Sequence, residues 1–340
     1  TTLVKNIYPG SDSYGYPNSS NPGKFTMSNG ILYFRATDGN NGNELWKTDG
    51  TYNGTKLVKD INPGSTGSFI LHLTAIGNLI YFAANDGTIA SELWVSDGTS
   101  AGTTLVKDIN PGSGSASPNG LTAAGNDLYF RANDGTNGNE LWQSDGTAAG
   151  TVIVKDINPG NSSSFPQDLT AIGSEIFFKA NDGINGTEFW KSNGTTAGTV
   201  LVKDINPGSG TSNIQELEAV GSDIYISAND GTNGIELWKS DGTTAGTILV
   251  KDIIPGLGSS FPTQLSAIGS ELYFRANNIT NGYELWKTDG TNAGTQMVKD
   301  INPGSSPSDP LKITSIGSQI FFRANDGTHG AELWTTDGTT

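Results

Sequence analysis

The sequence predicts an all-β protein, a seven-bladed β-propeller with four-stranded antiparallel blades. Seven tryptophans occur at constant intervals of 48 residues, and the chain has no other tryptophan. Each interval contains four short runs rich in Ile, Val, Leu, Phe and Tyr, which suit a pleated sheet. Four short strands in about 40–50 residues are typical of one propeller blade, whereas the rung of a β-helix is shorter. The repeat therefore favours a propeller.

The fourth repeat illustrates the expected strands. We expect an inner strand over residues 169–173, followed by strands over residues 175–180, 188–192 and 200–205. Gly and Asn-Asp-Gly clusters separate these runs, as they do in hairpin turns. Because both faces of a blade pack against neighbouring blades, we expect strands that are apolar without strict alternation.

The two ends of the chain complement each other within this repeat. The last repeat stops before its fourth strand, and residues 3–7 match the missing strand. We therefore expect velcro closure, in which the N-terminal strand completes the last blade and no sheet edge stays free. This predicts a single propeller over residues 1–340. Its blades are expected at about residues 25–61, 73–109, 121–157, 169–205, 217–253, 265–301 and 313–340 plus 1–7.

An eight-residue motif carries a family resemblance. Glu-Leu-Trp-x-x-Asp-Gly-Thr recurs in six repeats, and the fourth copy departs from it with Phe189 and Asn193. The chain resembles the bacterial ELWxxDGT repeat family over its whole length. The resemblance implies a seven-bladed propeller in an extracellular or cell-surface protein, and it supplies no catalytic residues. The matching copies occupy residues 44–51, 92–99, 140–147, 236–243, 284–291 and 332–339.

Charge and composition argue against several partners. The net charge is -15 at pH 7, so nucleic acid and anionic membrane surfaces would be repelled. No apolar run approaches the ~20 residues of a membrane helix, so we expect no membrane insertion. The sequence contains no cysteine, which leaves no disulfides and no thiol chemistry.

The loop between the second and third strands of each repeat is rich in oxygen ligands, as in residues 133–140, Asn-Asp-Gly-Thr-Asn-Gly-Asn-Glu. Hard cations such as Ca²⁺ prefer such ligands. A hairpin held by bonds from the Asp side chain to the backbone explains the same residues, and Asn278 replaces this Asp in the sixth repeat. No cofactor is required, and calcium is the one candidate. Its candidate ligands are Asp38, Glu44, Asp86, Glu92, Asp134, Asn137, Glu140, Asp182, Asn185, Glu188, Asp230, Asn233, Glu236, Asp326 and Glu332.

Aromatic residues are the candidate binding groups. The first repeat carries six extra residues within residues 10–24, including Tyr14 and Tyr16. Tyrosines on an exposed loop suit stacking on sugars or proteins, and a plain surface loop is the alternative. The tryptophans are expected to pack between blades, with an exposed stacking platform as the alternative. They are Trp46, Trp94, Trp142, Trp190, Trp238, Trp286 and Trp334.

Two further repeated elements are expected to be structural. One is the turn after the third strand, Ser-Asp-Gly-Thr at residues 144–147. The other is the Lys155-Asp156 pair in the fourth strand of the repeat, where adjacent side chains point to opposite faces. Each member of that pair is therefore expected to contact a neighbouring strand or blade.

The sequence gives no sign of catalysis, and we predict that the protein is not an enzyme. His72 and His329 occupy unrelated positions in the repeat. Acid–base catalysis needs groups with separated pKa values, which equal repeats do not offer. The expected inner strands carry small hydroxyl residues, with Glu218 as their sole acid. These hydroxyl residues are Thr74, Thr122, Thr170, Ser266 and Thr314.

Together these features predict a non-catalytic, secreted or cell-surface bacterial propeller that acts as a binding or structural interaction module. Its partner would be an extracellular protein or glycan, and it would act as a monomer or within a larger extracellular assembly. One alternative is a multivalent carbohydrate-binding lectin with sites repeated between blades. Another is a calcium-stabilised scaffold, or a recently amplified or designed repeat protein with minimal function.

Overall fold

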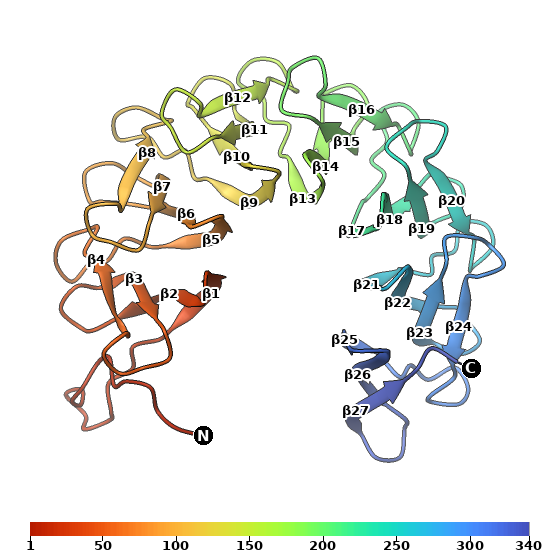
Figure 1. Cartoon of the computed structure of the whole chain (residues 1–340). Coiled ribbons are helices and arrows are strands. Elements are labelled where there is room, and N and C mark those ends of the chain that lie inside the picture. Colours follow the sequence, from red (N-terminus) through yellow and green to blue (C-terminus); the bar gives the residue numbers. More distant parts are fainter. Residues whose placement is uncertain (340) are drawn as a thin grey trace. The chain divides into compact units, whose positions relative to one another are not determined.

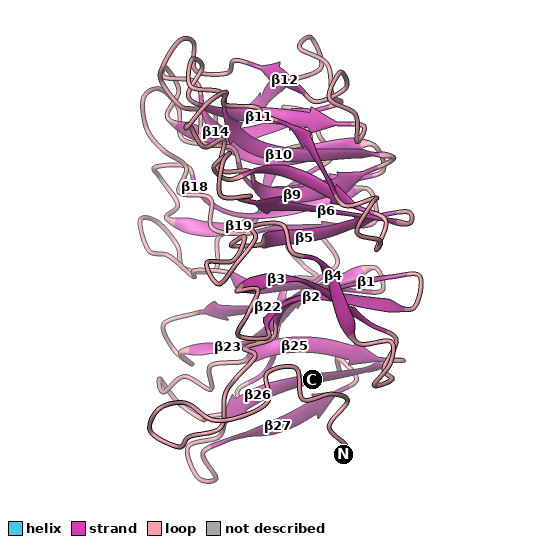
Figure 2. Cartoon of the chain, turned by 90° about the vertical axis from the view of Figure 1, so that its left-hand side faces the viewer, coloured by secondary structure: helices cyan, strands magenta, loops and turns pink. Residues whose placement is uncertain are grey.

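The architecture is built of short strands and turns (Figure 2). The structure, a computed structural model, describes residues 1–339, and these contain 27 strands and no helix. Accordingly, the described residues include no helix with the length and apolarity needed to cross a membrane. Contacts divide the chain into two compact units, Thr1–Glu175 with Gly194–Thr196, and Ile176–Asn193 with Ala197–Thr340.

Consecutive strands form antiparallel sheets, here called blades one to seven in chain order (Figure 1). Blade one has β1 (Gly23–Ser28), β2 (Ile31–Thr37), β3 (Asn43–Thr48) and β4 (Lys56–Lys59). Blade two has β5 (Leu71–Ile76), β6 (Leu79–Ala84), β7 (Glu92–Ser96) and β8 (Thr104–Lys107). Blade three has β9 (Asn119–Ala124), β10 (Asp127–Asn133), β11 (Asn139–Ser144) and β12 (Val152–Lys155).

The remaining blades follow the same order. Blade four has β13 (Gln167–Ile172), β14 (Glu175–Asn181), β15 (Thr187–Ser192) and β16 (Val200–Lys203). Blade five has β17 (Leu217–Val220), β18 (Asp223–Asn229), β19 (Ile235–Ser240) and β20 (Ile248–Lys251). Blade six has β21 (Thr263–Ile268), β22 (Glu271–Asn277), β23 (Tyr283–Thr288) and β24 (Gln296–Lys299). Blade seven has three strands within the described residues, β25 (Leu311–Ile316), β26 (Gln319–Asn325) and β27 (Ala331–Thr336).

A two-residue turn sets the register of each inner hairpin. In blade three, Ala124 pairs with Asp127, so that Gly125 and Asn126 form the whole connection. Gly125 has a φ of 61°, a conformation that glycine adopts without strain and that matches the twist of the hairpin. The register continues outward, where Phe130 of β10 lies opposite Trp142 of β11.

The core lies between successive blades. In the first unit, Phe82 and Trp94 of blade two pack in one buried cluster with Leu45 and Val58 of blade one. In the second unit, the same positions of blades five and six form an equivalent cluster. Six tryptophans are only 5–6% exposed, which confirms the packing interpretation for them and excludes an exposed stacking platform. They are Trp46, Trp94, Trp142, Trp190, Trp238 and Trp286, while Trp334 is half-buried.

The strand boundaries differ from the prediction at both edges of blade four. Strand β13 begins at Gln167 rather than at residue 169, and β16 ends at Lys203 rather than at 205. The cause at the inner strand is a β-bulge, seen in blade two as a register shift between Leu71 and Thr74. His72, within the shift, has a φ of 56°, so the strand resumes pairing before the bulge.

The predicted velcro closure would join the N-terminal segment to blade seven, which belongs to the other compact unit, and it stays a prediction. Residues 1–6 have no regular structure, and Leu3 is 79% exposed. The segment nevertheless contacts blade one as a fourth strand contacts the next blade: Lys5 Nζ donates to the carbonyl oxygen of Thr55 at 2.7 Å, and Lys59 Nζ donates to Thr103 O at 2.7 Å. Beside blade one, the segment therefore makes the lysine contact that a fourth strand makes with the blade after it.

Candidate functional site

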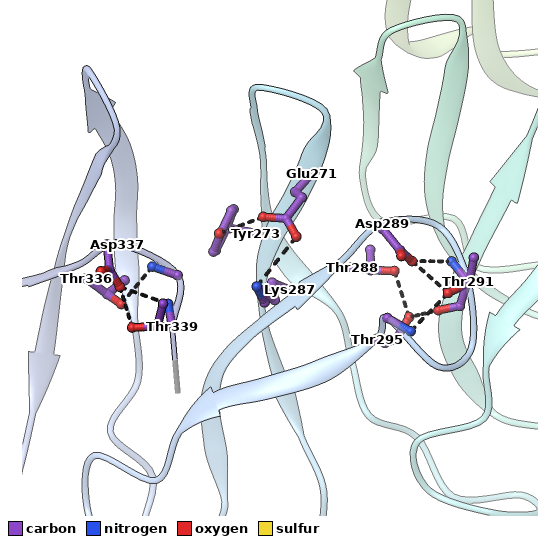
Figure 3. Close-up of polar contacts among 12 residues, drawn as sticks. Glu271, Tyr273, Lys287, Thr288, Asp289, Thr291, Thr295, Thr336, Asp337 and Thr339 are labelled. Carbon is purple, nitrogen blue, oxygen red and sulfur yellow. Dashed lines mark hydrogen bonds and ion pairs between the residues drawn. The ribbon is translucent and has the colours of Figure 1, made fainter.

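The turn between the third and fourth strands uses its polar groups internally, as Figure 3 shows for blade six. The carboxylate of Asp289 accepts hydrogen bonds from the backbone N–H and the hydroxyl of Thr291, at 2.9 and 2.7 Å. The hydroxyls of Thr288 and Thr295 lie 2.7 Å apart. The same bonds recur in blade three around Asp145. The predicted structural role of this turn is confirmed.

The loop between the second and third strands is also held by its own aspartate. In blade three, Asp134 Oδ1 accepts the backbone N–H groups of Thr136 and Asn137 at 2.8 Å, and Asp134 Oδ2 accepts Asn137 Nδ2 at 2.7 Å. Burial opposes ionisation of Asp134, but these hydrogen bonds lower its pKa overall. In blade six, Asn278 Oδ1 accepts Asn281 N at 2.8 Å in the same place. The turn interpretation of these residues is confirmed.

The glutamate of the repeated motif lies elsewhere, in the core. Glu140 is fully buried and accepts three hydrogen bonds, from Ile157 N at 2.9 Å, Ser164 N at 2.8 Å and Ser164 Oγ at 2.5 Å. Burial raises the pKa of Glu140 to about 7, against the opposing effect of these donors. The glutamate therefore joins the third strand to the linker that leads to the next blade.

These placements divide the candidate calcium ligands into two sets. The loop residues bond within their own loops, and they are Asp38, Asp86, Asp134, Asn137, Asp182, Asn185, Asp230, Asn233 and Asp326. The second set consists of the motif glutamates, of which Glu332 is exposed. The other five are buried: Glu44, Glu92, Glu140, Glu188 and Glu236. Within residues 1–339, the structure places no group of three His, Asp or Glu side chains where they could hold a metal ion. Calcium stays a prediction.

The fourth strand and the inner strands connect successive blades. Lys107 Nζ donates to Thr151 O of the next blade at 2.7 Å, so the strand lysine contacts a neighbouring blade through a carbonyl. On the inner strands, Thr74 Oγ1 donates to Leu121 O at 3.0 Å. Glu218 accepts Ala267 N at 3.2 Å, and burial raises its pKa. These contacts join successive blades and are structural.

The insertion in blade one forms a small hairpin that presents two tyrosines. Asp12 Oδ1 accepts the N–H groups of Tyr14 and Tyr16, both at 2.9 Å, and Asp12 N donates to Tyr16 O at 2.8 Å. The tyrosine side chains are 85% and 71% exposed. The turn thus holds the backbone in place while both rings face solvent, in an arrangement that no other repeat carries.

A second candidate site, which the sequence reasoning missed, is a cavity of about 550 Å³ on the inner strands of blades two to four. This volume lies within the range of about 300–1,000 Å³ that is usual for small-molecule sites. It is lined by His72 from β5, Asn119 from β9, Arg131 from β10, and Gln167 and Asp168 from β13. Asn119 Nδ2 lies 3.1 Å from His72 Nε2, so two blades join across the cavity wall.

The cavity contains an incompletely satisfied guanidinium group. Arg131 Nε is buried and has no hydrogen-bond partner among the described residues. Burial lowers the pKa of Arg131, yet an arginine remains charged in proteins. Its guanidinium carbon lies 5.9 Å from the centre of the Phe165 ring, which is 52% exposed. A half-buried guanidinium whose buried Nε has no partner marks a place that a ligand could complete.

One sequence signal could have found this cavity. One position at the start of the inner strand differs in type between blades, whereas the residue after it is large and apolar in every repeat. Six of the seven residues at this position have a positive φ. His72 matched no motif because it is one member of this variable series. The series is Lys24, His72, Gly120, Asp168, Glu216, Gln264 and Lys312.

Comparison with known proteins identifies the fold. No family model matches this chain, and no curated protein sequence matches it. Among solved structures, the computationally designed protein Ika8 is 17% identical, with 94% of this chain and 84% of that chain covered and a TM-score of 0.52. A prolyl endopeptidase is 12% identical, with 94% and 50% covered and a TM-score of 0.54.

A third solved structure, prolyl oligopeptidase B from Galerina marginata, is 14% identical, with 91% and 47% covered and a TM-score of 0.51. The chain spans about half the length of these two prolyl peptidases. At such low identity the likeness concerns the fold alone. The predicted fold class is confirmed: the chain is an all-β protein with the fold of a seven-bladed β-propeller.

Proposed function

We propose that this propeller is a non-catalytic interaction module, secreted or displayed on a bacterial surface, whose partner contacts the blade-one hairpin. The observation that carries the proposal is the exposure of Tyr14 and Tyr16 on a backbone fixed by Asp12. Tyrosines supply a large contact area at a low entropy cost and combine apolar and hydrogen-bonding contacts. The extracellular setting and the membership of the ELWxxDGT repeat family rest on the motif resemblance.

The use of the repeated polar groups supports this proposal. The turn aspartates, the buried glutamates and the strand lysines bond within a blade or to the next one. Such groups contribute to the scaffold and are not available to a partner. Binding is therefore assigned to departures from the repeat, among which the hairpin is the most exposed. An extracellular protein or a glycan fits the two tyrosines, and no nucleic acid fits the charge of -15.

The test is capture of bacterial surface material by the immobilised protein and by the double variant Tyr14→Ala/Tyr16→Ala. We expect the double variant to lose most of the captured partner, because the two rings supply the contact area. The matched control is Tyr52→Ala, which removes another exposed tyrosine of blade one, 64% exposed. Equal capture by all three proteins, or robust hydrolase activity in a substrate screen, would refute the proposal.

The multivalent lectin is the second candidate function. Its seven equivalent sites would lie between blades, where six tryptophans are buried and fill the space. A lectin function would therefore have to use other groups, and the cavity of blades two to four offers them. A glycan array with and without calcium separates the hypotheses: inhibition by a free monosaccharide favours a lectin, and its failure favours a protein partner.

A further inference from the structure

Blades three and six each have an arginine at the same position of the repeat, in two different environments. In blade six, Arg275 forms an ion pair with Asp309: Nη2 lies 2.7 Å and Nε 3.2 Å from Asp309 Oδ1. Arg131 occupies the equivalent position in blade three, and Phe165 replaces the aspartate. The backbone at the replaced position is the same, with a φ of 48° at Phe165 and 47° at Asp309. Blade three therefore keeps the cation and lacks the internal carboxylate.

Two positive charges act on the cavity, which is also lined by one carboxylate, that of Asp168. The pKa of His72 is lowered, first by burial and then by the positive charges of Lys24 and Arg131. Both charges therefore act on the region of His72, within a chain whose net charge is -15. An anion that binds at Arg131 therefore meets a local positive charge within an otherwise acidic protein.

We propose that the cavity bounded by His72, Asn119 and Arg131 binds an acidic monosaccharide, whose carboxylate pairs with Arg131 as Asp309 pairs with Arg275. A guanidinium group binds carboxylates through two parallel hydrogen bonds, and this pairing is strongest where water is excluded. The carboxylate of the ligand would supply the partner that Phe165, in the place of an aspartate, does not give to Arg131.

The other groups of the cavity favour a sugar over a simple carboxylate. The amides of Asn119 and Gln167 can both donate to and accept from ring hydroxyls. The half-exposed ring of Phe165 lies beside Arg131, where the apolar face of a pyranose can stack on it. A volume of about 550 Å³ accommodates one such ring with its substituents.

The experiment is isothermal titration calorimetry with sodium glucuronate, using glucose and sodium acetate as matched ligands at constant ionic strength. We expect saturable binding of glucuronate and none of glucose. Acetate, which has the carboxylate without the ring, should bind at least ten-fold more weakly. The variant Arg131→Gln should weaken glucuronate binding at least ten-fold, and its thermal unfolding is recorded to establish that it folds.

A second variant keeps the arginine and fills its carboxylate position. Phe165→Asp reproduces the sequence of blade six, so the new aspartate should pair with Arg131 and abolish glucuronate binding while the fold is retained. Arg275→Gln is the control in an equivalent position and should leave binding unchanged. The proposal is overturned if glucuronate shows no saturable binding up to about 20 mM, if glucose or acetate binds equally well, or if Phe165→Asp binds like the unaltered protein.

This site lies outside the blade-one hairpin and goes beyond the proposed interaction function. The Tyr14→Ala/Tyr16→Ala variant should bind glucuronate normally, and Arg131→Gln should capture the surface partner normally. Failure of one proposal is therefore distinguishable from failure of the other.

Discussion

Blades six and seven have nearly the same sequence but differ in the completeness of their sheets. Blade six has a fourth strand, and blade seven has three strands within the described residues. Leu285 of β23 is 1% exposed, whereas the equivalent Leu333 of β27 is 77% exposed. Glu284 is fully buried and accepts Ile301 N and Ser308 N, while Glu332 is exposed. Leu285 packs with Val298 of the fourth strand and with Ile313 and Phe322 of blade seven, so these neighbours, rather than the motif itself, make it part of the core.

The largest expected difference concerns the motif tryptophans. Trp286→Ala removes a ring that is 6% exposed and should destabilise the protein by about 3–5 kcal/mol. Trp334→Ala removes a half-buried ring and should cost less than half as much. Urea unfolding of both variants measures the two values, and similar losses would contradict the assigned role of the fourth strand.

The motif glutamates should show a smaller difference of the same kind. Glu284→Ala leaves the buried N–H groups of Ile301 and Ser308 without an acceptor and should cost about 2–3 kcal/mol. Glu332→Ala changes an exposed side chain and should stay within about 0.5 kcal/mol. The ratio of the two losses, again from urea unfolding, tests whether the donors give the glutamate its importance.

The pH dependence of stability should come from the complete blades. The ordinary pKa of a glutamate is 4.5, and burial raises that of Glu140 to about 7. Between these values the folded state holds the proton that the unfolded state has released, so stability should fall as the pH rises from about 4.5 to 7.

The variant Glu140→Gln keeps a hydrogen-bonding side chain and removes this titration. It should flatten the decline by an amount on the order of 1–2 kcal/mol. Melting temperatures of the unaltered protein and of the variant at pH 5 and pH 8 provide the measurement. A melting temperature of the unaltered protein that does not fall between these two pH values would disprove the assignment.

The smallest expected difference lies in the turn after the third strand. Asp289 and Asp337 accept the same two bonds in blades six and seven, from the N–H and hydroxyl groups of Thr291 and Thr339 (Figure 3). These bonds are local and do not need a fourth strand. Asp289→Ala and Asp337→Ala should therefore lower the melting temperature slightly and equally, and a marked difference would show that the turn depends on the complete blade.

Local features of the sequence were sufficient for the strands and turns. The interval of the tryptophans and the Gly-Asn turns predicted the number of blades and the inner hairpins, because backbone preference and apolar pattern act over a few residues. The bulge at His72 was not predicted, because residues of unrelated types occupy this position and their types do not indicate a positive φ. The closing strand was also predicted, from the matching ends of the repeat, and it stays a prediction because it would join the two compact units.

The candidate sites divide in the same way. The sequence alone marked Tyr14 and Tyr16, because an insertion interrupts an otherwise regular repeat. It did not indicate that Arg131 lacks an internal carboxylate, because Phe165 lies 34 residues away and only the fold brings the two side chains together.

The sequence by itself thus determined the repeat, the strand content and the chemistry of each turn, all of which depend on residues close together in the chain. The tertiary structure decided which copies of a group are buried, paired or left open. Arg275 pairs with Asp309 and Arg131 lies beside Phe165, although both arginines occupy the same position of the repeat. Burial and pairing depend on neighbours contributed by other strands and blades, and a repeated motif does not specify those neighbours.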